Sequence, residues 1–434
     1  MNERRRQAAL VAYRAFSDLA GKGAFFLVTL VAARRLSQDA FGLFSLGTTI
    51  GWIAAVATDF GIQLHLARAV AQQPGDAARL LRAWFKVRLW TSALAIVTVG
   101  VGLALTSQSG AFSRAILLFT LIYVVNGLIE FLHYFYRGLA RSDVESTLTL
   151  WQRAAMLALA VAALWWRPDV TLLALAMAIP SVATFLYSSR LARRLATVAN
   201  SSSLTKTSTP PDAASPRDAL DSVIPIGAGI VLSALYFRID VFLVQAWQGT
   251  TAVALYNAVF RLVEAMRLFP AAVLAVALPV LFQATSRHAL VKLSTLLTGA
   301  ALAVSLTVSM VATQVVPLLY GNRYAAAVPA FRILLLAFPL MSLNYALTHQ
   351  LIGWHGHRAY AVMCAAALAF NIALNAVLIP ALGIAGAAWS TIFTELVITF
   401  GCVIALAKIG AARQLHPVNL SDAANASTLS AVLS

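Results

Sequence analysis

Ionisable side chains recur inside long apolar stretches of this sequence, where an unpaired charge is costly if the stretch crosses a bilayer. Thirteen such groups facing lipid at mid-depth, at about 2.5–3.5 kcal/mol each, would cost on the order of 30–45 kcal/mol. This exceeds the stability of a typical fold. Most of them must therefore face a polar interior, pair with one another or lie near a membrane surface. The thirteen residues are Arg14, Asp18, Lys22, Asp59, Glu130, Arg153, Arg238, Asp240, Arg261, Glu264, Arg267, Arg332 and Glu395.

Two of the apolar stretches carry their charges on a single helical face. Arg14, Asp18 and Lys22 are four residues apart, a spacing that stacks them on one side of a helix as a polar stripe of alternating sign. A second stripe, with spacings of four, three and three, comprises Asn257, Arg261, Glu264 and Arg267. The recurrence of this pattern in both halves of the chain indicates a shared polar interior.

Arg238 and Asp240 lie two residues apart in the stretch that precedes the second stripe. This spacing puts them about 200° apart around a helix. We therefore expect the two side chains to serve different surfaces unless the helix is irregular.

The acids Asp59 and Glu130 complete the candidate set. Asp59 lies near the inner end of its stretch and is either part of a gate or a helix-end charge at the headgroups. Glu130 belongs to a stripe on a third helix, formed by Asn126, Glu130, His133 and Arg137. Its last members approach the predicted cytoplasmic end.

The chemistry favoured by these residues is the binding of an anion. The candidate binding residues are Arg14, Lys22, Arg238, Arg261 and Arg267, against three acids on the same helices. Guanidinium groups bind diphosphate bidentately, so a mildly cationic cavity would attract such a group. The candidate coupling or gating residues are Asp18, Asp59, Asp240, Glu264 and Glu130. They would reduce the positive electrostatic potential of the cavity, hold arginine side chains in position or carry a proton. The alternative is that the charges form ion pairs between helices, with Arg14, Arg137 and Arg267 reaching to the headgroups.

The composition requires a membrane setting for these residues. Of 434 residues, 60% are hydrophobic and 11% charged, and the net charge is +16. A soluble domain carries roughly 25% charged residues. A window of about 19 residues predicts twelve spans, at 14–33, 43–66, 89–107, 115–136, 148–166, 170–189, 222–246, 253–283, 293–317, 328–351, 360–380 and 384–407. The predicted fold class is an all-α polytopic membrane protein.

The excess of basic residues marks one side of the membrane. With both termini in the cytoplasm, 20 of the 32 Lys and Arg residues fall in cytoplasmic segments, five on the opposite side and seven within spans. Arg88 is counted here as cytoplasmic. This is the bias that the positive-inside rule predicts, and it accounts for the charge without nucleic acid.

A polar segment divides the chain into two similar halves. The stretch SSSLTKTSTPPDAASPRD is rich in Ser, Thr and Pro and is typical of a flexible linker. We predict an N-terminal six-helix lobe at 1–195, a cytoplasmic linker at 196–220, a C-terminal six-helix lobe at 221–410 and a cytoplasmic tail at 411–434. Two similar lobes can rock about a central site, as in many transporters.

Enzymatic function is not supported by any motif. The sequence has no Walker loop, nucleophile elbow or zinc spacing, and no exterior loop is predicted to exceed about a dozen residues. We therefore expect neither catalysis nor a metal or cofactor.

Several strings resemble the polysaccharide-type flippases of the multidrug/oligosaccharidyl-lipid/polysaccharide (MOP) exporter superfamily. After the first span come Arg35-Leu36, Phe41-Gly42-Leu43-Phe44 and Asp59-Phe60-Gly61 followed by Arg68. YFRIDVFLVQAWQGTTAVALYNAVFRLVE resembles the seventh and eighth spans of that family, YGNRYAAAVPAFRIL the turn before the tenth, and LGIAGAAWSTIFTE the twelfth. Together they cover nearly the whole chain.

The resemblance implies two six-helix lobes in a V around a cavity that opens alternately to each side. It implies a flippase that moves undecaprenyl-diphosphate-linked oligosaccharide across the bacterial inner membrane for surface polysaccharide synthesis. The implied partners are this lipid-linked substrate, membrane lipids and possible polymerases and glycosyltransferases. Two alternatives stay open: a proton- or sodium-coupled exporter of drugs or organic cations, and a non-transporting scaffold for glycosyltransferases.

Overall fold

A computed structural model describes residues 3–106, 108–203, 216–283, 287–354 and 356–415. Within these ranges the regular structure is entirely helical. Each of the twelve predicted spans overlaps a described helix, and the predicted all-α fold class is confirmed.

The helices of the first half form the N-lobe. They are α1 (Glu3–Arg35), α2 (Gln38–Asp59), α3 (Ile62–Gln72), α4 (Ala77–Ala104), α5 (Gly110–Gly138), α6 (Ser142–Trp166) and α7 (Val170–Ser203), with a 3-10 turn, η1, at Pro74–Asp76.

The helices of the second half form the C-lobe. They are α8 (Pro216–Met266), α9 (Leu268–Gln283), α10 (Arg287–Met310), α11 (Ala312–Tyr320), α12 (Val328–Gly353), α13 (His357–Leu382) and α14 (Ile384–Leu415), with a 3-10 turn, η2, at Asn322–Ala327.

Helix α8 is a hairpin of two membrane-crossing segments. Its 51 residues are interrupted at Gly249, whose φ of 80° lies in the left-handed region that glycine adopts without strain. Arg238 in the first arm donates to Glu264 in the second at 2.8 Å, although 26 residues of straight helix would separate them by about 39 Å. Eleven stretches in the described ranges are long and apolar enough to cross a membrane. Because the longest of them folds back at Gly249, the described ranges provide twelve crossings.

Polar caps and left-handed residues set the ends of several helices. Ser37 and Ser109 accept from the backbone N–H three residues on, each at 3.2 Å, and so begin α2 and α5. Helix α2 ends where Phe60 and Gly61 take φ values of 42° and 82°. Predicted span two therefore continues past the end of α2 into α3, which is a short separate helix.

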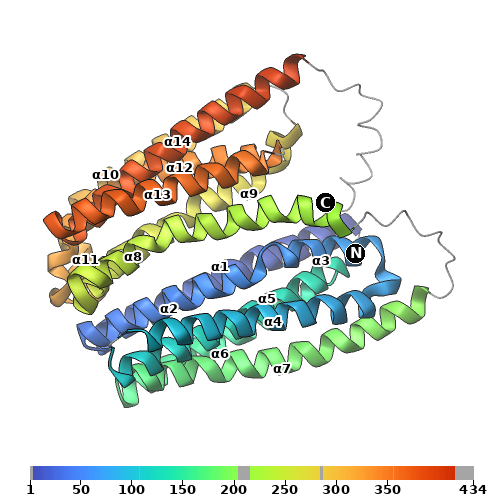
Figure 1. The fold of residues 1–434 in the computed structure, drawn as a ribbon, viewed down its shortest axis with the longest axis horizontal. Coiled ribbons are helices and arrows are strands. Elements are labelled where there is room, and N and C mark those ends of the chain that lie inside the picture. Colours follow the sequence, from blue (N-terminus) through green and yellow to red (C-terminus); the bar gives the residue numbers. More distant parts are fainter. Residues whose placement is uncertain (1–2, 107, 204–215, 284–286, 355, 416–434) are drawn as a thin grey trace.

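The two lobes form a V. They lie close together at the end that holds α11 and the start of α2, and diverge toward the end from which α1 starts (Figure 1). Helices α2 and α8 make the most extensive contact between the lobes.

A cluster of hydrogen bonds joins the lobes at their narrow end. Arg34 donates to the carbonyls of Leu318 and Leu319, the latter at 2.8 Å. Gln38 donates to the carbonyl of Arg323 at 2.7 Å. Three further bonds join Arg323 and Tyr324 to the carbonyl of Ala33, and Thr251 to Asp39. The narrow end is thus closed by bonds that mostly use backbone carbonyls.

The boundaries of the predicted linker differ from the helices. Helix α7 continues to Ser203 and α8 begins at Pro216, so both helices extend into the predicted segment 196–220. Residues 204–215, and 416–434 of the predicted tail, lie outside the described residues.

Candidate functional site

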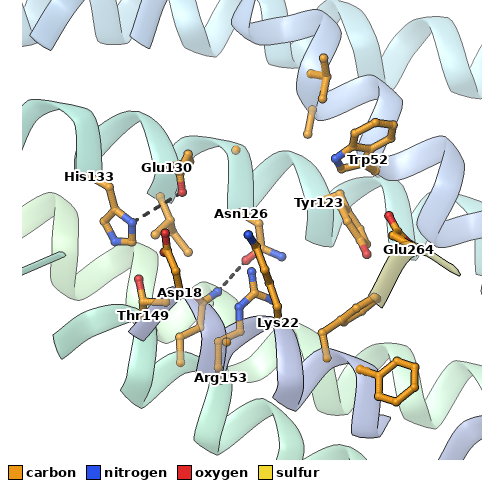
Figure 2. Close-up of a pocket in the computed structure, with 18 of the residues that line it drawn as sticks. Asp18, Lys22, Trp52, Tyr123, Asn126, Glu130, His133, Thr149, Arg153 and Glu264 are labelled. Atoms are coloured by element: carbon orange, nitrogen blue, oxygen red, sulfur yellow. Dashed lines mark hydrogen bonds and ion pairs between the residues drawn. The ribbon is translucent and has the colours of Figure 1, made fainter. Parts of the chain in front are cut away.

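A cavity of about 750 Å³ lies between the lobes. Side chains from α1 to α6 line it on the N-lobe side, and side chains from α8, α9 and α12 on the C-lobe side. Figure 2 shows part of this lining. A space of this size suits a ligand of several rings or a large headgroup.

Eight of the ten candidate residues line the cavity. They are Asp18, Lys22, Asp59, Glu130, Arg238, Arg261, Glu264 and Arg267. The structure does not bring Arg14 or Asp240 into this lining. Arg14 is instead 3.9 Å from Glu145 on α6, near the start of the N-lobe bundle.

On the C-lobe side of the cavity, the C-lobe wall, one carboxylate oxygen bridges two arginines. Glu264 Oε2 accepts from Arg238 Nη2 at 2.8 Å and from Arg261 Nη1 at 2.7 Å. Arg238 also donates to Asn257 Oδ1 at 3.2 Å and lies over the ring of Phe260 at 4.5 Å. The two arginines are therefore fixed side by side, facing the space between the lobes.

Arg238 and Asp240 serve different surfaces, as their spacing predicts. Asp240 is 3% exposed and accepts from the hydroxyl of Tyr256, which is itself 3.4 Å from the Thr391 hydroxyl. Asp240 thus joins the two arms of α8 to α14 inside the C-lobe.

Polar residues of α12, α13 and α14 hydrogen-bond between helices. Asn344 donates to Glu395 Oε2 at 2.7 Å, and Asn371 donates to Thr394 at 2.9 Å. Glu395 is therefore a buried interhelical acceptor.

The basic residues on the N-lobe side of the cavity form no ion pair with any acid among the described residues. Lys22 and Arg153 come together there with Asp18 (Figure 2). Neither cation forms an ion pair within the described part of the chain. Arg153 lies in the middle of α6. The sequence identifies it as a cation within a span, but it is not among the predicted site residues.

Arg88 is a functional candidate that the sequence misplaces. The predicted spans place it in a cytoplasmic segment, but α4 begins at Ala77, and Arg88 is buried in the N-lobe at 1% exposure and lines the cavity. Its Nη2 donates weakly to the carbonyls of Ala55 and Gly127 at 3.3 and 3.4 Å. Its Nε and Nη1 have no partner among the described residues.

A separate ion-pair network lies beside Glu130. Arg137 donates to Glu145 at 2.8 and 2.5 Å and to Glu130 at 3.3 Å, and His133 is 3.7 Å from Glu130. The predicted stripe on α5 is therefore largely neutralised by its own lobe.

Asp59 lines the cavity but also holds a helix end. Its Oδ1 accepts from the backbone N–H of Gln63 at 3.1 Å, in the first turn of α3. This geometry matches the helix-end alternative for Asp59.

Aromatic and amide groups complete the lining. Trp52 and Tyr123 face the space from α2 and α5 (Figure 2). Gln152 donates to Asn126 at 2.6 Å. Aromatic rings offer flat apolar surface, and amides both donate and accept hydrogen bonds.

The electrostatic balance of the lining is cationic. Six basic residues and five acids touch the cavity, and two of the acids, Glu130 and Glu145, are already bound by Arg137 outside the lining. Lys22, Arg88, Arg153 and Arg267 form no ion pair among the described residues. The described residues also contain no group of three acidic, His or Cys side chains that could hold a metal ion.

The eleven apolar stretches in the described ranges and the cavity between the lobes define a multi-pass membrane protein. The family model described as "Polysaccharide biosynthesis protein" matches residues 9–285, and the chain belongs to that family. No curated protein sequence is significantly similar to the chain.

Solved transporters share the fold at low sequence identity. An inward-facing MATE multidrug resistance transporter of the MOP superfamily superposes with a TM-score of 0.64 at 14% identity, covering 91% of this chain and 96% of the other. The outward-facing form of a MATE multidrug resistance transporter gives a TM-score of 0.62 at 15% identity, covering 93% and 96%. A MOP superfamily transporter from Pyrococcus furiosus gives 0.59 at 13% identity, covering 93% and 96%.

Proposed function

We propose that the chain is a flippase that moves polyprenyl-diphosphate-linked oligosaccharide across the bacterial inner membrane for polysaccharide synthesis. The observation that carries this proposal is the cavity between the lobes, in which basic residues outnumber acids and four cations form no ion pair with another described residue. Buried guanidinium groups bind phosphate oxygens in pairs. The membership of the polysaccharide biosynthesis family agrees with such a substrate.

The rest of the lining suits the sugar part of the substrate. Trp52 and Tyr123 present rings against which the apolar faces of sugars can pack. Asn126 and Gln152 supply amide donors and acceptors for hydroxyl groups. In this proposal the diphosphate is held by the arginines and the sugars by the aromatic and amide groups.

Alternating access would move the substrate. The described state is closed at the end where Arg34 and Arg323 bond across the lobes. With the termini in the cytoplasm, as the positive-inside bias predicts, that closed end is exterior and the state is inward-facing. The solved relatives of this fold include inward-facing and outward-facing forms, which supports a rocking motion.

Pocket charge is the feature that distinguishes the alternatives. The Pyrococcus furiosus transporter was described as having a binding pocket of reverse polarity, suggesting a different function for that protein. A second candidate function here is export of organic cations, which is favoured by the fold match to multidrug transporters. The cations of this cavity that form no ion pair among the described residues would repel such substrates, so the flippase is the better supported function.

Deletion of the gene tests the proposal in cells. We expect lipid-linked oligosaccharide to accumulate on the inner leaflet and surface polysaccharide to fall at least about tenfold, because product can no longer leave the cytoplasmic side. The measurement is extraction and mass analysis of lipid-linked sugars, with the wild-type gene on a plasmid as control. Normal polysaccharide together with raised sensitivity to cationic drugs would favour the exporter instead.

A further inference from the structure

The two arginines on the C-lobe wall are occupied by a single acid of the same chain. Glu264 Oε2 accepts from both Arg238 and Arg261 at 2.8 and 2.7 Å. Its Oε1 accepts no hydrogen bond within the described part of the chain. One anionic oxygen bridging two guanidinium groups is the arrangement that a phosphate oxygen would adopt in the same place.

The three side chains differ in how firmly they are held. Arg238 is 3% exposed and is fixed by Asn257 and the ring of Phe260, and Arg261 is 16% exposed. Glu264 is 35% exposed, and the two arginines are its only ion-pair partners among the described residues. The carboxylate is therefore the member that can leave while the arginines stay in position.

A neighbouring cation can receive the displaced carboxylate. Arg267 lies three residues after Glu264, at the junction between α8 and α9, where its backbone N–H donates to the carbonyls of Val263 and Glu264, each at 3.2 Å. Arg267 lines the cavity, lies over the ring of Phe237 at 4.4 Å and forms no ion pair within the described ranges. Rotation of Glu264 toward Arg267 would free both arginines for a ligand without leaving the acid unpaired.

We propose that Glu264 is a displaceable internal ligand that competes with the substrate for Arg238 and Arg261. This inference rests on the proposed function. It assigns Glu264 the role of a specificity-determining residue, because every anion that binds the arginines must first displace it.

The competition favours ligands with more than one negative charge. When a phospholipid with a monoanionic headgroup binds, its phosphate only replaces the carboxylate of Glu264. The number of charge-assisted hydrogen bonds to the arginines barely changes, so the binding free energy is small. A diphosphate carries enough negative charge to accept from both arginines and to retain charge for a further cation of the lining. Glu264 thus lowers the affinity of the site for abundant monoanionic phospholipids, and it also keeps the two arginines in position when no substrate is bound. Weakening the binding of a competitor in this way increases specificity.

Neutralising this acid gives the direct test. Glu264→Gln keeps the size and one acceptor, but its hydrogen bonds to the arginines lose their ionic strengthening. We expect farnesyl diphosphate to bind the full-length variant in phosphatidylcholine nanodiscs about tenfold more tightly than wild type. A tenfold change corresponds to about 1.4 kcal/mol. We also expect dioctanoyl phosphatidylglycerol to become an effective competitor.

A purely structural role for Glu264 predicts the opposite change in affinity for farnesyl diphosphate. If Glu264 only holds the arginines in place, Glu264→Gln weakens farnesyl diphosphate binding, and weaker or unchanged binding overturns the inference. Should this variant fail to fold, Glu264→Asp decides by the same rule, because its shorter carboxylate cannot bridge both arginines and must also tighten binding. Asp143→Asn is the matched control, since it breaks the ion pair with Arg141 outside the cavity.

The wild-type protein separates this inference from the proposed function. If wild type binds farnesyl diphosphate and Glu264→Gln does not bind it more tightly, only the role of Glu264 is wrong. If wild type binds no farnesyl diphosphate but does bind an organic cation such as rhodamine 6G, the proposed function is wrong.

Discussion

Replacement of Arg238 and Arg261 together by glutamine is expected to lower translocation at least about 100-fold. Each arginine offers charge-assisted hydrogen bonds worth about 1.5–3 kcal/mol to an anion, and two such losses multiply. The measurement is the initial rate at which lipid-linked diphosphate sugar becomes accessible on the far side of proteoliposomes that hold equal amounts of inserted protein.

The double variant also leaves Glu264 without its partners, so a third change separates binding from folding. Adding Glu264→Gln removes the unpaired acid and should restore the melting temperature while the rate stays low. Arg141→Gln, which changes an exposed arginine outside the cavity, should keep the wild-type rate. Translocation at the wild-type rate in the double variant would show that these arginines do not hold the substrate.

Replacement of Gly42 by valine is expected to prevent closure of the narrow end. A Cβ atom at Gly42 would lie 2.1 Å from the carbonyl oxygen of Thr250 on the other lobe, a contact that backbone must move to relieve. Because α2 and α8 cannot close over this side chain, the lobes stay apart there and translocation falls at least about tenfold.

The conformation of this variant can be measured by spin-label distances. The labels are attached through Gln108→Cys and Gln314→Cys, because both glutamines are exposed and lie on opposite lobes at the narrow end. The native Cys364 and Cys402 are fully buried. We expect the distance between the labels to lengthen in Gly42→Val. Gly100→Val is the control, because a Cβ there meets nothing within 4 Å. An unchanged distance with normal transport would show that this contact is not a gate.

The positions of the helices could be predicted from the sequence because a bilayer imposes their length and hydropathy. The opposed directions of Arg238 and Asp240 likewise follow from helical period alone. The stripe Arg14, Asp18 and Lys22 shows where such reasoning ends. Its members share one face, yet Lys22 reaches the cavity and Arg14 lies near Glu145 of α6, because neighbouring helices decide what that face meets.

Sequence reasoning missed site residues for two reasons. One predicted span starts too late along its helix, and one cation within a span is not assigned to the site. Arg88 follows three cations in a polar stretch, so it is counted with the loop although α4 begins eleven residues earlier. Arg153 and Gln152 lie at mid-span, where ionisable groups are costly. That cost was a usable signal for Arg153. The bridge from Glu264 to two arginines depends on the hairpin at Gly249, and nothing in the linear spacing shows that Arg238 and Glu264 meet.

The most direct test of the account is translocation by the purified full-length protein in proteoliposomes. The substrate is a polyprenyl-diphosphate oligosaccharide, and the readout is its accessibility to a glycan-modifying enzyme added outside. The account predicts that the protein speeds exposure of this lipid at least about tenfold over empty vesicles, that the Arg238 and Arg261 double variant does not, and that rhodamine 6G is not transported. Transport of rhodamine 6G with no movement of the lipid-linked sugar would contradict it.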